Sequence, residues 1–518
     1  MPLPAHIAAQ VARLDASAQT LFELVWHMHE EQMAELAVLR AENDKYRQML
    51  FGSRSEKLPP IESEVRRVVE AEELTPEALG LDEKATDDEV AAARTKQRRK
   101  RGRASSEVAR KRRKADLSKL PVLREEVSVR DEDLPEGMTR DDFGVVGTGT
   151  VVQRIEHVRE HLVVTEYVLE TLSDGSGDHI IKAEAPPSVV LGGAWGASVY
   201  ARVVVSKCVD SMPLYRQQRT LSRAGYSVAR STLCAMVHRA AGLLEAVYAR
   251  LMTLASEHPY VHADETKLRI GEPKLARNGW VWTVLCENIV GYVFSESRGS
   301  ETPNGLLGSS KGMLMVDGYG GYNGVVGEDG RTRAGCWAHA RRKFFDALKT
   351  APEAREVLDL IVQLYRVEHA AAAKDVLGTD VHAAMRVELC TPILERIDAW
   401  VDARRGRAVP KSPFGNAIVY AYNQRTAMRQ FLTDPKIPLD NNIAERALRV
   451  VAVGRKNYLF VGHAEAGQNL AVLQTICHTC LLHDVNPYEY IKDVLVRVSS
   501  HPASKLDELL PQNWQSPP

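Results

Sequence analysis

The sequence lacks any apolar run approaching the roughly 18 residues that a membrane-spanning helix needs. Its first residues also lack the basic-then-apolar order of a secretory signal peptide. The composition is otherwise that of a soluble globular chain, with 44% hydrophobic and 26% charged residues. We therefore expect a cytoplasmic protein without a membrane partner.

Cysteine is scarce, with seven residues in a chain of 518 and none before Cys208. An odd and scattered set gives no disulfide framework, so we expect reduced thiols. Cys477 and Cys480 form one C-x-x-C pair, but a structural zinc site needs four ligands and the chain has no second pair. Their apolar surroundings favour ordinary buried positions in a helix.

Net charge is also nearly absent, at −1, and by itself gives no reason to expect a nucleic-acid partner. The distribution of charge along the chain is uneven. Acids dominate residues 62–89, whereas residues 94–114 hold twelve Lys or Arg and the single acid Glu107. This basic run either binds phosphates without sequence preference, through counterion release, or is a solvated linker.

The length of the whole chain suggests three or four domains. The sequence of its N-terminal part predicts several small ones. A 4,3 spacing between Phe22 and Leu50 predicts a coiled-coil helix within residues 1–58, although an amphipathic helix packed on its own chain fits equally well. Residues 59–115 read as an acidic and basic linker with too little apolar surface to fold. Alternating runs within residues 116–190, among them residues 149–172, predict a small β module.

Residues 191–254 have a helical pattern, in which one helix, an Ala-Gly turn and a second helix follow one another between Met212 and Ala241. This is the layout of a helix-turn-helix, although any helical hairpin looks similar in sequence. In the DNA-reading interpretation, the second helix presents to a groove the side chains of Arg230, Ser231, Thr232 and Arg239.

Within an expected catalytic domain at residues 255–465, residues 255–345 alternate β-like runs with turns, three in succession and then a fourth that ends in Asp317. This order matches the start of an RNase H-like fold, an α/β architecture with a mixed sheet. Residues from about 345 to 430 read as helical throughout and predict a helical insertion. Residues 466–518 predict a C-terminal helical element. The expected fold class is therefore multidomain, α/β plus α.

Three acids lie where such a fold would present them to a cleft. Asp264 lies in an extended run in which His262 shares its face and Glu265 points to the other. Asp317 ends an apolar strand beside flexible glycines, and Glu445 lies early in an amphipathic helix. Hard cations take oxygen ligands, and phosphoryl transfer commonly uses two of them. Asp264, Asp317 and Glu445 are therefore candidate catalytic and metal-binding residues for two Mg²⁺ or Mn²⁺ ions.

Each acid also has an ordinary structural interpretation. Asp264 and Asp317 are acceptable as strand-edge or turn acids, and Glu445 as the partner of an Asn442 helix cap. A metal-dependent nuclease or phosphatase that uses His262 and Asp264 is a different class of answer, as is a DNA-binding protein with an inactive site. The joint occurrence of three acids in this order favours the two-metal interpretation.

The chain contains, in this order, the long segments VHADET, MVDGYGGYN, GCWAHARRKFFDAL, PLDNNIAERALRVVAVGRKNYLFVG and NPYEYIKDVL. These segments resemble, in the same order and over nearly the whole chain, those of the insertion-sequence 66 family of bacterial DDE transposases. The resemblance implies that Asp264, Asp317 and Glu445 are the catalytic triad of a transposase. Its partners would be transposon ends and target DNA. We also expect a homo-oligomer that joins two ends, with accessory proteins of the same element as further candidate partners.

One departure from the family concerns a cysteine-based zinc module that its members usually carry before the helix-turn-helix. This chain has Phe143, Gly144 and Val145 about where a cysteine pair is expected. We therefore expect the module at residues 116–190 to be a degenerate zinc-binding region that folds without zinc.

Aromatic and cationic side chains in the matching segments are further candidates for DNA contacts, by stacking on a base or gripping phosphate. A solvated helix start is the alternative for those near residue 340. Arg449 has two interpretations, a contact with the DNA backbone or an i,i+4 pair with Glu445. The remaining candidates are Trp337, His339, Arg341, Arg342, Lys343, Arg455 and Lys456.

Overall fold

The computed structural model describes residues 61, 162–173, 180–183, 185–190, 192–271 and 276–516. The predicted coiled-coil helix and the basic run lie outside these residues, as does most of the predicted β module. The chain divides into two compact units, Met1–Pro60 and Ile61–Pro518, and the second holds everything described below.

Of the predicted β module, the structure describes one antiparallel hairpin, formed by β1 (Thr171–Ser173) and β2 (Ile180–Lys182). The strand predicted through residues 149–172 is wrong for residues 162–170, which have no regular secondary structure. Val164 and Val168 there are more than 90% exposed. Alternating apolar residues form a strand only where a neighbouring strand or layer buries them, and none of the described residues does so here.

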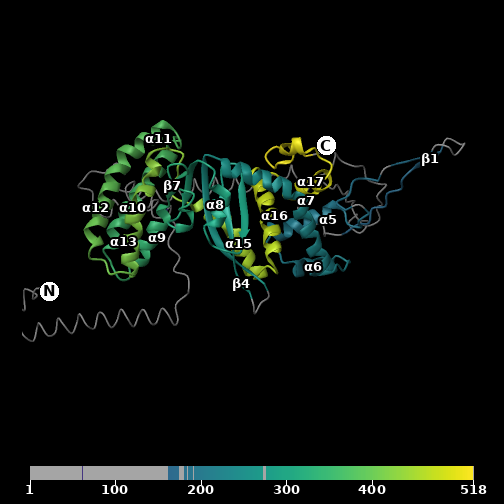
Figure 1. Cartoon of the computed structure of the whole chain (residues 1–518), viewed down its shortest axis with the longest axis horizontal. Helices are drawn as coiled ribbons and strands as arrows, with labels where there is room; N and C mark the ends of the chain where they lie inside the picture. Colours follow the sequence, from purple (N-terminus) through teal and green to yellow (C-terminus); the bar gives the residue numbers. More distant parts are fainter. Residues whose placement is uncertain are drawn as a thin grey trace, which may run out of the picture. The chain divides into compact units, whose positions relative to one another are not determined.

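A mixed five-stranded sheet lies in the middle of the described part of the chain (Figure 1). Asp264 lies in its strand β3, and Asp317 directly follows its strand β6. The strand order of the sheet is β5-β4-β3-β6-β7, in which β3, β4 and β5 form an antiparallel meander and β6 and β7 run parallel to β3. Parallel pairing requires a crossover, which here includes the short helix α8 (Glu301–Leu307). The prediction of three strands followed by a fourth that ends in Asp is confirmed. The strands are β3 (Tyr260–Ile270), β4 (Arg277–Leu285), β5 (Val290–Ser295), β6 (Gly312–Val316) and β7 (Arg331–Gly335).

Helices that precede the strands in the chain and helices that follow them both pack against the sheet. A single hydrophobic core runs from the preceding helices across the sheet to the following ones and includes Leu244, Tyr292 and Leu473. The preceding helices are α5 (Ala197–Cys208), α6 (Leu214–Arg223) and α7 (Arg230–Glu257). The following helices are α15 (Asn442–Tyr458), α16 (Ala464–Leu482) and α17 (Pro487–Arg497), before a final 3₁₀ segment, Ala503–Leu509.

Helix α16 covers the edge strand β5, whose outward N–H groups would otherwise be unpaired. The backbone N–H groups of Val290 and Tyr292 donate to Thr479 Oγ1 (3.3 Å) and Thr475 Oγ1 (2.9 Å). Cys477 and Cys480 lie in the same helix as buried free thiols, so their predicted positions are confirmed. No helix in the described part of the chain is both long and apolar enough to span a membrane.

The turn between α6 and α7 depends on Gly225, whose φ of 101° is a conformation that side-chain-bearing residues rarely adopt. The predicted helix, Ala-Gly turn and second helix are therefore confirmed as secondary structure. The second helix continues well past the predicted hairpin, to Glu257, and its C-terminal half belongs to the core beneath the sheet.

A second hydrophobic core forms among the helices between β7 and α15, with Phe344, Ile361 and Trp400 among its members. These helices gather at one side of the sheet (Figure 1), which leaves α15 room to reach the strands. The prediction that residues 345–430 are helical is confirmed. The elements are α9 (Trp337–Ala347), α10 (Ala354–Ala373), α11 (Asp380–Met385), a π-helical turn (Arg386–Cys390), α12 (Thr391–Arg405), α13 (Pro413–Asn423) and α14 (Arg425–Met428).

Candidate active site

The sheet places Asp264 and Asp317 on neighbouring strands. His262 of β3 pairs with Met315 of β6 in parallel register. Continuing that register by two positions sets Asp317, the first residue after β6, beside Asp264. Neighbouring strands lie about 4.8 Å apart, so both carboxylates belong to one small region of the sheet. Each side chain is partly buried.

Negative charge accumulates around Asp264. Burial raises the pKa of Asp264 to about 7, and the neighbouring carboxylates of Glu265, Asp317 and Glu445 add to the shift. The backbone N–H of Glu265 donates to Asp264 Oδ1 (2.9 Å), which opposes the shift only in part. A half-buried carboxylate among other acids is poorly stabilised by the protein alone, and this environment suits a hard divalent cation.

The loop after β6 fixes the orientation of Asp317. The backbone N–H of Tyr319 donates to Asp317 Oδ1 (2.8 Å). A Cβ on Gly318 would lie 2.7 Å from the Tyr420 ring and 3.2 Å from Gln424 Nε2. Glycine at this position therefore lets α13 pack closely.

Helix α15 presents Glu445 from its first turn, and Asn441 fixes the start of that helix against β3. Asn441 is fully buried; its Nδ2 donates to the Ala263 carbonyl (2.8 Å) and its Oδ1 lies 2.9 Å from His262 Nδ1. The Asn442 cap considered from sequence is not formed, because Asn441 occupies the N-cap position and its side chain bonds the strand instead.

His262 is a positioning residue for this junction. Burial lowers the pKa of His262 to about 4, although the hydrogen bond with Asn441 acts in the opposite direction. The imidazole is therefore neutral at physiological pH, and one ring nitrogen is already committed to Asn441. This commitment weakens the alternative in which His262 and Asp264 form the metal-binding pair of a nuclease.

Two side chains of α9 engage Glu445. Arg342 Nη2 lies 3.3 Å from Glu445 Oε2, and His339 Nε2 lies 3.7 Å from Oε1. Burial lowers the pKa of His339, against the raising effect of Asp317 and Glu445, so Arg342 supplies the neutralising charge. Arg449 is exposed, and no ion pair within the described residues joins it to Glu445.

The carboxylates are near one another but are not assembled around a shared point. Within the described ranges, no three His, Cys, Asp or Glu side chains are close enough together to hold a metal ion. Glu445 Oε1 is buried and accepts no hydrogen bond, which leaves an oxygen ligand available. The donor set of Asp264, Asp317 and Glu445 therefore fits a divalent cation, provided that Glu445 turns away from Arg342.

Glu265 is engaged on the other side of β3, as its position in the strand predicts. Its side chain is 2% exposed, receives Arg298 Nη2 at 2.6 Å and accepts a hydrogen bond from the Tyr322 hydroxyl (3.0 Å). These partners neutralise Glu265, so it is not a fourth ligand candidate in this conformation.

The predicted DNA-contact cluster on α9 divides between two faces of the helix. Trp337 and Arg341 are 2% and 3% exposed, and the Trp337 indole N–H donates to the Met428 carbonyl (2.9 Å). The prediction that these two side chains contact DNA is wrong for this conformation, because positions 337, 340, 341 and 344 form the buried stripe of an amphipathic helix. His339 and Arg342 face the acids, and Lys343 Nζ lies 4.9 Å from the centre of the Tyr420 ring.

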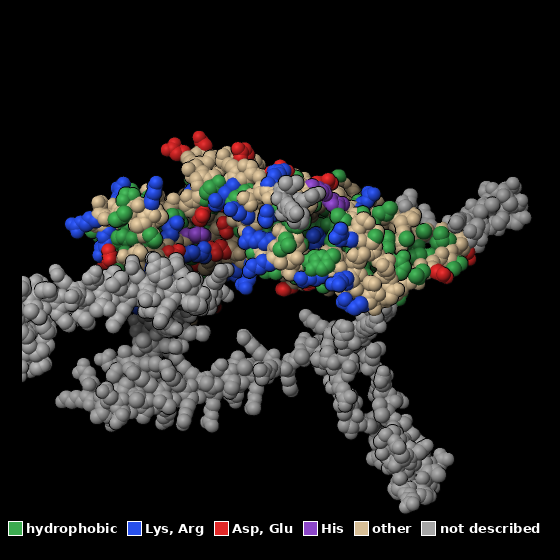
Figure 2. Space-filling view, turned by 90° about the horizontal axis from the view of Figure 1, so that it is seen from below, with side chains coloured by type: hydrophobic (Ala, Val, Ile, Leu, Met, Phe, Trp, Pro, Cys, Tyr) green, Lys and Arg blue, Asp and Glu red, His purple; other side chains and the backbone are tan. Residues whose placement is uncertain are grey.

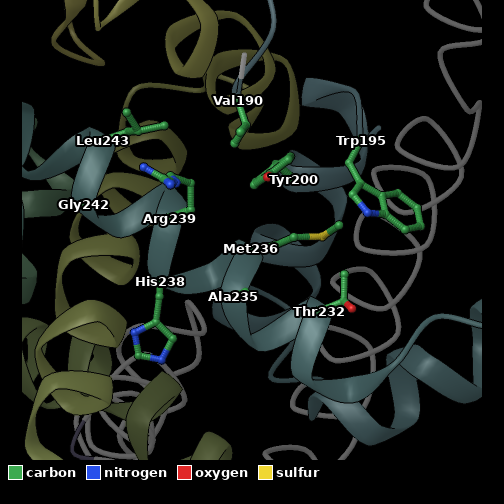
Figure 3. Close-up of a pocket in the computed structure, with 10 residues that line it drawn as sticks. All are labelled: Val190, Trp195, Tyr200, Thr232, Ala235, Met236, His238, Arg239, Gly242 and Leu243. Carbon is green, nitrogen blue, oxygen red and sulfur yellow. The ribbon is translucent and has the colours of Figure 1, made fainter. Parts of the chain in front are cut away.

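The candidates on α7 and α15 have different surroundings. Arg230 is exposed at the start of α7, whereas Thr232 and Arg239 line a cavity of about 710 Å³ together with Trp195 and other largely apolar side chains (Figure 3). On α15, Arg455 donates to Thr266 Oγ1 (2.9 Å) and the Lys267 carbonyl (2.8 Å) and thereby ties the helix to β3. Lys456 is exposed.

The raised pKa of Asp264 predicts how stability depends on pH without metal. The fold favours the protonated form, so the stabilisation present below about pH 4 is lost as pH rises towards 7. We expect Asp264→Asn to have a higher Tm than the wild type at pH 8, with a smaller difference at pH 5. Mn²⁺ should raise the Tm of the wild type more than that of the variant. Equal melting temperatures at pH 8, measured by calorimetry, would contradict this electrostatic account.

Comparison with known proteins gives the family. The family described as "Transposase IS66 family" matches residues 192–469, a span that includes all three acids, and "IS66 C-terminal element" matches residues 475–512. Uncharacterized protein y4jD of Sinorhizobium fredii (strain NBRC 101917 / NGR234) is 32% identical over 358 residues, which cover 65% of this chain and 70% of that protein. Uncharacterized protein y4qI of the same organism is 31% identical over 360 residues, or 65% and 66% of the two chains. The chain belongs to the IS66 family of transposases.

Proposed function

We propose that this chain binds the ends of its insertion sequence and catalyses two-metal phosphodiester cleavage and strand transfer. Asp264, Asp317 and Glu445 are the proposed catalytic residues. The observation that carries the proposal is the placement of two aspartates on adjacent parallel strands, with a glutamate from α15 close enough to raise the pKa of Asp264. Family membership supports the general class of activity.

Mg²⁺ is the proposed cofactor, with Mn²⁺ as a substitute, and the three carboxylates are its proposed ligands. Two such ions would activate the attacking oxygen and stabilise the leaving oxygen of an in-line displacement. The protein itself orients the ligands. Tyr319 holds Asp317 through its backbone N–H, and Asn441 holds the start of α15 beside Asp264.

Arg342 has a proposed double role in this scheme. In the DNA-free chain it neutralises Glu445. A DNA phosphate offers Arg342 a competing partner that accepts charge-assisted hydrogen bonds. Phosphate binding to Arg342 would therefore release Glu445 for the metal, so that the ligand set is completed only when DNA is present.

The remaining parts of the chain have matching proposed roles. The order of the five strands supports an RNase H-like catalytic domain, and α6, its glycine turn and α7 support a helix-turn-helix that binds DNA. The boundaries of these domains, residues 191–254 and 255–465, are predictions from the sequence. A reaction that joins two transposon ends also calls for a homo-oligomer.

A strand-transfer assay tests the function. The purified chain, incubated with Mg²⁺ and a labelled duplex that carries its own element's end, should produce DNA joined to a target molecule. Cleavage without joining would indicate a metal-dependent nuclease. Binding without either reaction would indicate an inactive relative that retains only DNA recognition.

A further inference from the structure

Helix α6 carries a row of cationic side chains on its exposed face. Its sequence, LYRQQRTLSR, contains no acidic residue. Arg216, Arg219 and Arg223 follow one another at i, i+3 and i+7, so they share one face of the helix, and all three are exposed. The opposite face packs into the core through Gln217 and Leu221.

Helix α15 carries a second cationic row, formed by the exposed Arg446, Arg449 and Lys456. With the exposed Val453 between them, these positions recur at steps of three and four residues, on the side away from the buried Leu448. The row begins one residue after Glu445. It therefore starts at the acidic site and runs towards the C-terminal end of the helix.

The two rows meet at the C-terminal end of α15. Arg216 Nη1 of α6 lies 3.4 Å from Asn457 Oδ1, next to Lys456. Lys207, in the last turn of α5, places its Nζ 4.8 Å from the centre of the Tyr458 ring. These contacts place α5 and α6 beside the end of α15, so the two rows border each other there.

Among the described residues, the positive charge of the two rows is largely without neutralising carboxylates. No ion pair among the described residues joins Arg216, Arg219, Arg446, Arg449 or Lys456 to a carboxylate. Figure 2 shows Lys and Arg side chains spread across the middle of the face seen from below, with few acids between them. Like charges on one helix face are destabilising, so an uncompensated row favours a polyanionic partner.

We propose that the two rows form one track that binds the phosphates of duplex DNA and leads from the helix-turn-helix to the acidic site. The proposal rests on the proposed function and specifies the path of its DNA. Glu445 and Lys456 are separated by about 16 Å along α15, at about 1.5 Å per residue. DNA rises about 3.4 Å per base pair, so the row on α15 would contact phosphates up to about five base pairs from the cut. The row on α6 would contact phosphates farther from the cut.

Phosphate contacts position DNA without reading its sequence. Removing cations of the track should therefore lower the affinity for every duplex equally, whatever its sequence. Two triple variants test it, R216Q/R219Q/R223Q on α6 and R446Q/R449Q/K456Q on α15, each in an Asp264→Asn chain that cannot cut. Binding of an end duplex and of a random duplex is measured from 50 to 300 mM KCl. Each variant should lower the salt slope of log affinity by about 2 to 3 and weaken both duplexes about 10- to 100-fold.

The control variant, R396Q/R407Q/K411Q, removes three positive charges from another part of the surface. Arg396 lies in α12, Arg407 and Lys411 follow it, and all three side chains are exposed. It should keep the wild-type slope. Unchanged slopes in both test triples would overturn the track, as would a loss restricted to one helix or to the end sequence. Failure of the wild type to join DNA would overturn the proposed chemistry while leaving these binding results intact.

Discussion

Asp264→Asn should abolish cleavage and strand transfer together, with a loss of roughly 10³-fold or more, while binding of the element's end persists or tightens. Asparagine keeps the size of the side chain but removes the charge that a hard cation requires. The same result is expected for Asp317→Asn and Glu445→Gln, because the proposed mechanism uses one ligand set for both reaction steps. Tighter binding is expected where a change removes a negative charge close to the proposed position of the DNA phosphates.

The matched control is Asp329→Asn, an exposed acid in the loop before β7 that lies outside the proposed ligand set. It should leave both reactions within about twofold of the wild type, in line with a surface substitution. Full activity in Glu445→Gln would remove the glutamate from the mechanism. Loss of cleavage with retained joining of a pre-cut end would show that the two steps use different residues.

Arg331→Met should lower the free energy of unfolding by about 3 to 5 kcal/mol, since it leaves several buried acceptors unsatisfied. The Arg331 guanidinium is fully buried, and burial lowers its pKa. It donates to Ser310 Oγ (2.8 Å) and to the carbonyls of Met313 (3.0 Å), Ser256 (2.6 Å) and His258 (2.9 Å). These bonds tie β7 and β6, the strand that leads to Asp317, to the end of α7.

Urea unfolding followed by tryptophan fluorescence measures this loss. Arg277→Met is the control, because Arg277 forms an exposed ion pair with Glu296 at 2.7 Å, and such pairs contribute at most about 1 kcal/mol. A loss below about 1 kcal/mol for Arg331→Met would indicate that water replaces the guanidinium at its acceptors.

The sheet was predictable because its signals are local. Short β-like runs separated by turns mark β3 to β5, and an apolar run that ends in Asp317 marks β6. Strand alternation also places Asp264 and Glu265 on opposite faces, in agreement with the separate partners of Glu265. The same signals failed for residues 162–170, where no neighbouring strand among the described residues buries the alternating side chains.

The supports of the acidic site were not predictable, because they join residues far apart in sequence. Asn441 follows Asp440 and precedes a helix, a pattern that indicates a cap, yet its side chain bonds β3. The pairing of Arg342 with Glu445 likewise depends on how α9 packs against α15. An apolar stripe through α9 was available in the sequence and would have identified Trp337 as a core residue.

Anomalous scattering from Mn²⁺ tests the central claim most directly. The sample is a crystal of the wild-type chain bound to an uncut DNA end, grown in Ca²⁺ and then soaked in Mn²⁺. The account predicts two Mn²⁺ ions roughly 4 Å apart, in contact with Asp264, Asp317 and a Glu445 that has left Arg342. Ions bound elsewhere, with Glu445 still paired to Arg342 in the presence of DNA, would contradict it.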